Sequence, residues 1–466
     1  MKKELLEKLV NKGLECGADY SEIFYEDKKE ATISFSSSVV NKCTIDLTKG
    51  VGIRLAKEKE IYYADTNDLD EENLISIIDS LNKNFDGVRV VPEVKLNELD
   101  NVNKINRELD LEALEKIKEK LYEYDKYARS LDKRVIQVVV TISHSNQYIN
   151  VASSKTNLTE DTRVRSGIYF RVIVKENARS ESSNFNIGFS KGFDFVDDKT
   201  MLKGIKEAVE AACAKLSAKS APGGEMPVVI GNGFGGVLIH EACGHAMEAT
   251  TVAENVSVLS DKLNKKIASS KVTIIDDGTK EEFWGTTKYD DEGNKTRKNI
   301  LIENGILKKY LEDELNARIM NHEVSGSGRR ENFKYIPTSR MNNTYLAPGN
   351  DSIEDMISSI KYGLYAKDMG GGIVNPATGD FNFSVTEAYM IRDGKIAEAV
   401  KGASLVGNTL TILEEIEMVG SDLAFGIGTC GSSSGGVPVT VGQPTIKLGK
   451  ILVGGENNDW KITFLC

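Results

Sequence analysis

Hydrophobic and polar residues follow two different rhythms in the first half of this chain. Apolar side chains recur every three or four positions in four stretches, which is the spacing of an amphipathic helix. These stretches predict helices at 4–12, 70–83, 109–125 and 199–216. Between them, runs rich in β-branched residues predict strands at 20–25, 32–35, 50–55, 61–64, 135–142, 163–174 and 184–190. The weakly patterned segment 84–108 predicts a connection.

The second half is rich in glycine and in short apolar runs. These runs predict strands at 271–276, 299–302, 385–391, 437–441 and 445–453. One helix is predicted at 351–363, with Asp351 as its N-cap and Glu354 completing a capping box. Because helices and strands are segregated rather than strictly alternating, the pattern predicts an α+β fold.

A small, polar segment with proline and glycine divides the two halves. Residues 217–224 read Ser-Ala-Lys-Ser-Ala-Pro-Gly-Gly, which is typical of a linker. We therefore expect an N-terminal domain of mixed helices and strands over 1–216. A strand-rich C-terminal domain, which carries the chemistry described below, is expected over 225–466.

The N-terminal domain contains a weak internal sequence similarity, called the echo below. Thr-Ile-Ser at 32–34 precedes Gly-Ile at 52–53, and Thr-Ile-Ser at 141–143 precedes Gly-Ile at 167–168. Each pair lies in a strand-rich stretch that is followed by a helix. The echo is consistent with two repeats, over 1–100 and 109–216, and equally with two similar β-meanders of independent origin.

Composition narrows the class of protein. The formal net charge of −11 argues against binding that depends on neutralising nucleic-acid phosphates. The first seven residues are charged where a signal peptide needs an apolar run. No stretch approaches the roughly 18 apolar residues of a membrane span. The six cysteines share no framework spacing and predict reduced thiols in the cytoplasm.

The chemistry concentrates in His-Glu-Ala-Cys-Gly-His, residues 240–245, on a predicted helix. This segment holds two of the four histidines in the chain. Imidazoles bind a borderline-soft cation such as zinc, and a neighbouring carboxylate can take a proton from a water at that cation. The plain alternative is a helix with two partly buried histidines. Glu241 favours a metal site, because a glutamate buried between two histidines has little other structural explanation.

The histidine spacing has a geometric consequence. Common zinc proteases place two histidines at i and i+4 of a helix, whereas His240 and His245 are five residues apart. On a regular α-helix they would point about 140° apart. A π-turn, or a helix that ends near Gly244, would bring them together. A metal site therefore predicts a distorted turn at 242–245.

A third protein ligand must come from elsewhere, because catalytic zinc uses three protein ligands and a water. The residues leave several candidates open, namely His144, His322, Cys243, Cys430 or a carboxylate. His144 and His322 sit in polar surroundings and are expected at the surface. Cys243 is expected in the core. Cys430 is flanked by glycine and is expected in a loop that can approach an ion.

A glycine-rich segment before the motif offers a competing interpretation. Residues 231–236 match the dinucleotide fingerprint G-x-G-x-x-G, follow a strand and precede a helix. The fingerprint also needs a second strand that ends in Asp or Glu, and residues 250–262 show none. We expect these glycines to let the strand turn tightly into the motif helix instead.

The chain resembles the TldD/PmbA family of metalloproteases, and within it the TldD branch. The matching segments run in order through the second half: 236–245, 275–279, 289–293, 301–307, 328–331, 340–345, 400–403, 430–431, 437–439 and 441–444. Looser matches lie at 50–54 and 63–65. The resemblance implies zinc held by His240, His245 and Cys430, with Glu241 as general base. It also implies a homodimer, or a heterodimer with a non-catalytic paralogue.

The expected function is a zinc peptidase that cleaves unfolded or small peptides, in which a glutamate-activated water attacks the carbonyl. Alternatives are a non-enzymatic modulator with a structural zinc and, with less support, a dinucleotide-dependent oxidoreductase. We expect no nucleic-acid or membrane partner. Arg329, Arg330 and Arg340 could orient a substrate carboxylate, or could form a solvated cluster with Glu331.

Overall fold

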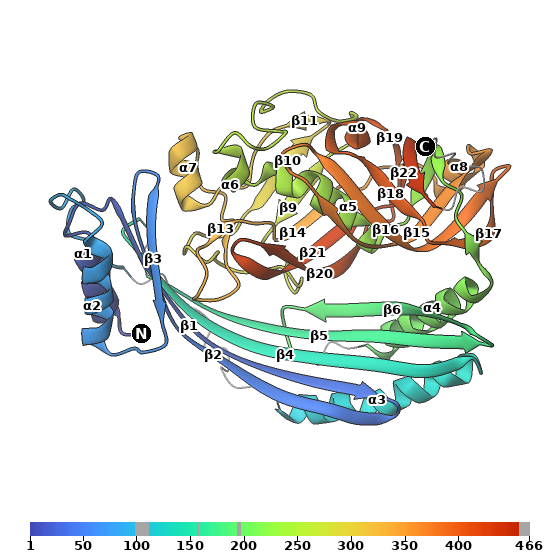
Figure 1. Cartoon of the computed structure of the whole chain (residues 1–466), viewed down its shortest axis with the longest axis horizontal. Coiled ribbons are helices and arrows are strands. Elements are labelled where there is room, and N and C mark those ends of the chain that lie inside the picture. The colour runs from blue at the N-terminus through green and yellow to red at the C-terminus, as the bar shows by residue number, and fades with distance from the viewer. Residues whose placement is uncertain (98–110, 156–157, 193–196, 456–466) are drawn as a thin grey trace, which may run out of the picture.

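The computed structural model describes residues 1–97, 111–155, 158–192 and 197–455. A long, curved sheet built from the first half of the chain lies along one side of a strand-rich body built from the second half (Figure 1). This architecture confirms the predicted α+β class. Part of the predicted connection, 98–108, and the first two residues of the helix predicted at 109–125 lie outside the described residues.

The N-terminal half runs helix, three strands, helix, and then repeats that order. Its elements are α1 (Lys3–Gly13), β1 (Tyr20–Ser36), β2 (Val39–Lys57), β3 (Glu60–Thr66), α2 (Glu71–Asn82), α3 (Leu111–Leu131), β4 (Val135–Ser153), β5 (Thr159–Glu176), β6 (Arg179–Phe189) and α4 (Asp198–Ser217). The six strands form one antiparallel sheet in the order β3-β2-β1-β4-β5-β6. The runs predicted at 20–25 and 32–35 are the two ends of the single strand β1.

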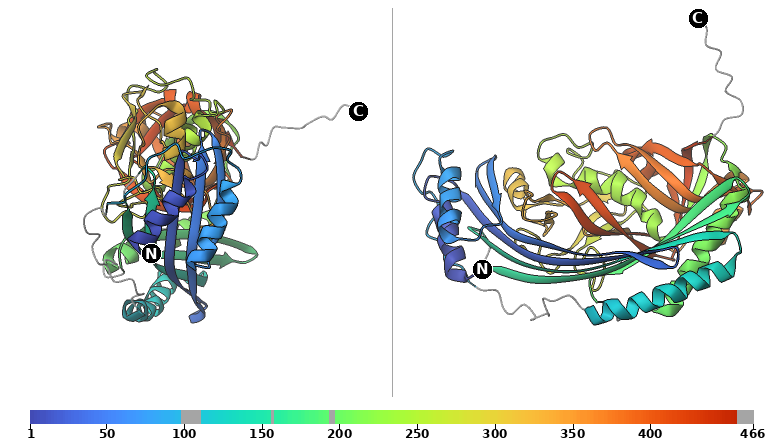
Figure 2. Two further views of the ribbon diagram at one scale, coloured as in Figure 1. Left: turned by 90° about the vertical axis from the view of Figure 1, so that its left-hand side faces the viewer. Right: turned by 60° about the horizontal axis from the view of Figure 1, so that its bottom comes forward.

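The two faces of this sheet have different partners. On β1, Ile23 and Ile33 point toward the helices, which cover one face: α1 and α2 at one end, α3 and α4 at the other (Figure 2). Alternate residues of a strand point to opposite faces, so Glu22, Phe24 and Glu26 point toward the C-terminal body. Phe24 packs there against Phe333.

The C-terminal half contains two larger sheets. One has the order β11-β10-β9-β14-β21-β20. Its strands are β9 (Ile274–Asp277), β10 (Lys298–Glu303), β11 (Ile306–Leu307), β14 (Asn343–Leu346), β20 (Ala424–Ser432) and β21 (Gly435–Gln443). Strand β20 ends this order and pairs with β21 alone among the described strands. The other edge of β20 is therefore not paired with any described strand.

In the second sheet, β15, β8, β22, β18 and β16 pair in sequence, and β16 pairs back to β15. Its strands are β7 (Lys219–Ser220), β8 (Gly224–Ile230), β15 (Tyr362–Val374), β16 (Asp380–Arg392), β17 (Lys395–Lys401), β18 (Ser404–Asn408), β19 (Ile416–Val419) and β22 (Ile446–Gly454). A short pair, β12 (Gly328–Arg329) with β13 (Thr338–Ser339), and the helices α7 (Glu314–Met320), α8 (Ile353–Ser358) and α9 (Thr409–Glu414) complete the body.

The helix predicted at 351–363 is shorter than expected. Helix α8 begins after Ser352, whose hydroxyl accepts a hydrogen bond from the backbone N–H of Asp355, so Ser352 and not Asp351 is the N-cap. The carboxylate of Asp351 instead pairs with Lys271 and accepts from the N–H of Val419. The end of the predicted helix belongs to β15, because tertiary pairing with β16 overrides local propensity.

The segment predicted as a linker joins the two halves and takes part in the second sheet. Ser217 ends α4, residues 219–220 form β7 against β17, and Gly224 begins β8. Ala221, within the same segment, is fully buried. No helix within the described residues is long and apolar enough to cross a membrane.

Buried charges connect the curved sheet to the C-terminal body. The guanidinium of Arg54, on β2, binds the carboxylates of Glu22 and Glu292, and all three side chains are almost fully buried. A second pair joins Arg163 on β5 to Asp291. A buried ion pair is costly to leave half-broken, so these contacts favour one fixed arrangement of the two halves.

Candidate metal centre

The predicted motif helix is a succession of short helical segments. After β8, the chain forms a 3₁₀ turn, η2 (Gly233–Gly236), one α-turn, α5 (Val237–Ile239), and a π-turn, η3 (His240–Gly244). A second 3₁₀ turn, η4 (His245–Met247), leads into α6 (Ala249–Val252). The π-turn lies where the five-residue histidine spacing predicted a distortion.

Tight packing against neighbouring strands explains why the chain needs glycines here. A Cβ atom on Gly236 would lie 2.5 Å from backbone atoms of Gly442 on β21, and a Cβ on Gly244 would lie 1.9 Å from the Sδ of Met341. Gly231 and Gly236 therefore allow close approach of backbone to backbone. Gly233, between β8 and α5, has a φ of 74°, which agrees with the tight turn expected of these glycines in place of pyrophosphate binding.

The π-turn places both imidazoles beside a thiol from the other end of the body. One ligand atom each from His240, His245 and Cys430 lie within 4.8 Å of one another. The Nε2 of His245 is 3.3 Å from the Sγ of Cys430. The two imidazole rings are 5.4 Å apart at their centroids and nearly perpendicular. Two nitrogens and one sulfur facing a common point are the donor set that Zn²⁺ favours.

His240 supports this interpretation most directly. Its side chain is buried, and neither ring nitrogen has a hydrogen-bond partner among the described residues. A buried polar atom without a partner costs about 1–3 kcal/mol. A metal ion bound to one of these nitrogens would offset that cost, so the residues present fit the ion that the motif implies.

The protonation states also suit a cation. Burial by itself would raise the pKa of the Cys430 thiol, but the neighbouring imidazoles of His240 and His245 outweigh burial and lower that pKa to about 3. The side chain is therefore a thiolate, which is the form that binds metals. By contrast, burial raises the pKa of Cys243 above its usual range, and that thiol stays protonated in the core.

Glu241 lies at the open side of the group. Its Oε2 is 3.5 Å from the Nε2 of His245, and 22% of its side chain is exposed, compared with 12% for His245. Burial raises the pKa of this carboxyl, an effect that the two imidazoles partly oppose. A partly exposed carboxylate beside the ligand atoms is placed to exchange a proton with water.

The other ligand candidates do not join this group. Cys243 packs in the core, as expected. His144 was expected at the surface but is buried in the curved sheet, where its Nδ1 lies 2.8 Å from the Oγ of Ser166. His322 is partly exposed and pairs with Glu312. Cys430 lies on strand β20 and not in a loop, because its glycine neighbours sit in the β20–β21 ladder.

Two residues near the proposed ligands make contacts that were not predicted from the sequence. The Oε2 of Glu248 lies 3.0 Å from the Nδ1 of His245, where the carboxylate can accept the ring N–H, and its spacing of three residues from His245 was a signal that could have revealed it. Arg340 donates to the carbonyl of Cys430. Its distance in sequence left no local signal.

The three arginines were expected either to bind a substrate carboxylate or to form a solvated cluster. Arg329, Arg330 and Arg340 are all buried, so the solvated cluster is wrong. Arg330 pairs with Glu22 across the two halves, and Arg329 donates to the carbonyls of Met341 and Pro438. The residues next to these arginines in sequence did not indicate their burial, because each arginine side chain contacts groups that are distant in sequence.

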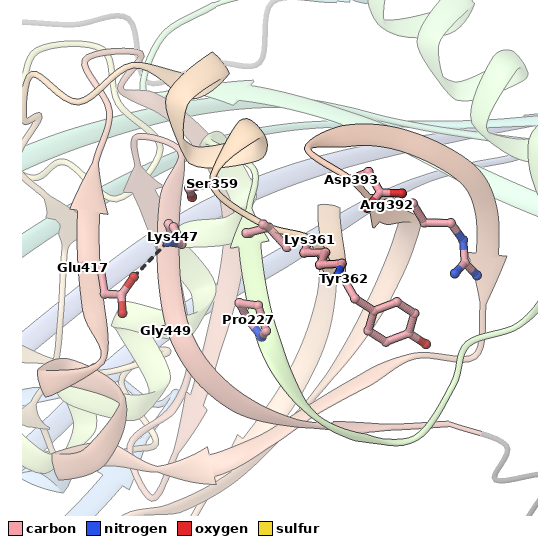
Figure 3. A pocket seen from close by; sticks show the side chains of 10 residues that line it. Pro227, Ser359, Lys361, Tyr362, Arg392, Asp393, Glu417, Lys447 and Gly449 are labelled. Carbon is pink, nitrogen blue, oxygen red and sulfur yellow. Dashed lines mark ion pairs between the residues drawn. The ribbon is translucent and has the colours of Figure 1, made fainter.

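A surface cavity of about 630 Å³ lies away from these residues (Figure 3). It is lined by Lys361, Tyr362, Arg392, Glu417 and Lys447, among others, and by none of the metal-binding group. Lys447 and Glu417 pair with each other at 2.9 Å across it. The cavity is therefore separate from the metal centre.

Comparison with known proteins identifies relatives along most of the chain. Family profiles described as PmbA/TldA metallopeptidase domain 1, central domain and C-terminal domain match residues 21–84, 106–216 and 223–455. A metalloprotease TldD homolog from Buchnera aphidicola subsp. Schizaphis graminum is 36% identical over 449 residues, covering 94% of this chain and 93% of that protein. A zinc metalloprotease TldD homolog from Saccharolobus solfataricus is 27% identical over 96% of this chain and 99% of that protein.

The fold also matches a solved structure. TldE from Thermococcus kodakarensis superposes with a TM-score of 0.76 at 21% identity, over 97% of this chain and 100% of that one. Such low identity shows a shared fold alone. The family profiles and the 36% identical relative place this chain in the TldD/PmbA family of metallopeptidases.

Proposed function

We propose that this protein is a zinc-dependent peptidase of unfolded or small peptides, with zinc held by His240, His245 and Cys430. The observation that carries the proposal is the convergence of two imidazoles and one thiolate, one imidazole having no other partner for its ring nitrogens. The zinc named for the Saccharolobus solfataricus relative supports the choice of metal.

A zinc ion in this group would polarise the scissile carbonyl and lower the pKa of a water molecule. The residues of the chain supply the rest of the chemistry. Glu241 accepts a proton from that water as general base, and later delivers a proton to the leaving amine. Its partial exposure gives water access to the carboxylate, and its raised pKa makes return of the proton easier.

The free edge of β20 suits an extended peptide. Ser432 and Gly435 flank the two-residue turn of the β20–β21 hairpin and form a hydrogen-bonded pair, so the backbone groups of Gly431 and Thr429 point to the open edge. Both residues are exposed and neighbour Cys430. A peptide that adds a strand at this edge would pass beside the metal and be held mainly through its main chain.

This mode of binding explains why unfolded or small peptides would be the substrates. Only a chain segment free of its own secondary structure can offer its backbone groups to β20. Main-chain recognition also gives loose sequence preference. Folded proteins would be poor substrates, because their scissile bonds cannot reach the strand.

We infer a dimer, either of two identical chains or with a non-catalytic paralogue. The structural likeness to TldE from Thermococcus kodakarensis supports a partner of that fold. We also propose a cytoplasmic location, since the five cysteines in the described part of the chain are free thiols. The net charge of −11 supports the absence of nucleic-acid partners.

A non-enzymatic modulator with a structural zinc is the second candidate. Structural zinc sites are closed by four protein ligands. Among the described residues, the convergent group contains three donors, and Glu241 beside them is partly exposed. These features favour a catalytic site over a structural one.

Purified wild-type protein and the Glu241→Gln variant test the proposal. Both are expected to contain about one zinc per chain, and only wild type should cleave a fluorescent unfolded peptide at a measurable rate. Glu323→Gln, at an exposed glutamate, is the matched control and should cleave like wild type. Equal cleavage by wild type and Glu241→Gln would remove Glu241 from the mechanism.

A further inference from the structure

The imidazole of His245 is held from both sides. Its Nε2 faces Cys430, while its Nδ1 lies 3.0 Å from the Oε2 of Glu248. Glu248 stands in an extended backbone conformation between η4 and α6, and only 6% of its side chain is exposed. A carboxylate that accepts the Nδ1–H proton fixes the ring orientation and leaves Nε2 available to a metal.

Strand β20, which carries Cys430, is held by a different residue. Arg340 is fully buried, and its Nη2 donates to the carbonyl oxygen of Cys430. Its Nη1 donates to the Oγ of Ser434 at 2.8 Å and to the carbonyl of Gly435 at 2.9 Å. One guanidinium therefore ties both sides of the β20–β21 turn next to the ligand.

Arg340 and Glu248 also face each other. The Nε of Arg340 is 3.8 Å from the Oε1 of Glu248, and neither atom has another hydrogen-bond partner among the described residues. The contacts run in a closed ring: His245 to Glu248, Glu248 to Arg340, Arg340 to the backbone of Cys430, and the Sγ of Cys430 back to His245. Two ligands that are distant in sequence thus share one buried support.

We propose that Glu248 and Arg340 are positioning residues that fix His245 and Cys430 relative to each other, and that the affinity of the site for metal depends on this pair. The charges agree with this role. Arg340 supplies a positive charge beside the buried carboxylate of Glu248. Arg340 is buried with Nη1 and Nη2 donating to protein oxygens and Nε facing Glu248, so it does not bind a substrate carboxylate.

The inference rests on the proposed function only in assuming a metal at this group, so metal binding is the readout. Zinc affinity is measured by competition with a chromogenic chelator for wild type, Glu248→Gln and Arg340→Lys. Loss of such a supporting partner typically weakens metal binding by about 10–100-fold, and both variants are expected to fall in that range. Arg329→Lys is the matched control, since Arg329 is equally buried and donates to two carbonyls without touching a ligand.

A cobalt(II) spectrum separates positioning from loss of stability. Both variants should show a weaker thiolate-to-cobalt absorption band than wild type and Arg329→Lys, because the Cys430 geometry has changed. If Arg340→Lys does not fold, Glu248→Gln alone tests the inference, because glutamine has nearly the same shape as glutamate. Zinc affinity within about threefold of wild type and an unchanged cobalt spectrum would overturn the inference. Failure of wild type itself to bind zinc or cobalt would instead remove the proposed function.

Discussion

The Nε2 of His245 lies 3.3 Å from the Sγ of Cys430, although 185 residues separate the two in sequence. The first residue belongs to the turns that follow β8, and the second to the edge strand β20. Both elements pack into one hydrophobic core, which holds the imidazole and the thiolate in contact. The proposed metal centre therefore depends on packing between segments from both ends of the C-terminal body.

Replacing Cys430 by serine should abolish metal binding, because a serine hydroxyl stays protonated where the thiol is ionised. The measurement is zinc content after dialysis, together with peptide cleavage. Cys243→Ala is the matched control: Cys243 is equally buried but protonated and outside the ligand group, so this variant should keep its zinc. Retention of zinc by Cys430→Ser would show that another residue is the third ligand.

Replacing Gly244 by alanine should strain the π-turn. The added Cβ would lie 1.9 Å from the Sδ of Met341, which is fully buried. Overpacking of this kind costs typically about 1–3 kcal/mol, measurable by denaturant unfolding. Gly431→Ala should be neutral, because nothing lies within 4 Å of its Cβ position. Because the π-turn carries His240, the same strain should weaken zinc binding by Gly244→Ala, and the double variant Gly244→Ala/Met341→Ala should recover that zinc affinity; no recovery would place the strain elsewhere.

Replacing Arg54 by methionine should destabilise the contact between the two halves. The carboxylates of Glu22 and Glu292 would remain buried without their shared cation, at a cost of about 3–5 kcal/mol in the free energy of unfolding. Arg318→Met is the control, since its ion pair with Asp19 is partly exposed and should be worth under about 1 kcal/mol. Similar losses for both variants would contradict the assigned role of the buried network.

Stability should depend on pH through Glu26, which faces the C-terminal body. Burial raises the pKa of its carboxyl to about 7, and hydrogen bonds from Gln147 and the Phe333 N–H only partly oppose that shift. In the unfolded chain the pKa is near 4.5. The folded protein therefore binds the proton more tightly, so the free energy of unfolding should fall as pH rises from about 4.5 to 7, by at most about 3 kcal/mol.

The variant Glu26→Gln isolates this contribution, because it cannot ionise. The difference in Tm between Glu26→Gln and wild type should become more positive between pH 5 and pH 8. Other buried carboxyls, such as Asp290 with a pKa raised to about 7, affect both proteins alike. A difference that stays constant across this range would mean that Glu26 keeps an ordinary pKa in the folded protein.

The sequence predicted the helices of the first half, the α+β class and the distortion at 242–245. It did so because helical periodicity, β-branched runs and the i, i+5 spacing of His240 and His245 are local properties. It missed the burial of His144 and the strand at Cys430. Both features depend on which distant strands pair. The polar residues around His144 suggested exposure, and the glycines around Cys430 suggested a loop.

The same limit applies to the support of the site. Nothing near Arg340 in sequence indicates Glu248 or Cys430, since those contacts form only when β20 and β21 pack against the motif turns. Cys430 could be assigned as the ligand only through resemblance to a family. Residue types and spacing alone left several donors open, among which Cys430 was expected to be able to approach an ion.

X-ray absorption at the zinc edge of the purified protein tests the central claim most directly. The account predicts two nitrogens at about 2.0 Å, one sulfur at about 2.3 Å and one further oxygen from a non-protein ligand, with the oxygen retained in Glu241→Gln. Cys430→Ser, which is expected to bind no zinc, should give no zinc-edge signal after dialysis. A first shell of four protein donors, or one without sulfur in the wild type, would contradict the assignment of His240, His245 and Cys430 as an open, catalytic zinc site.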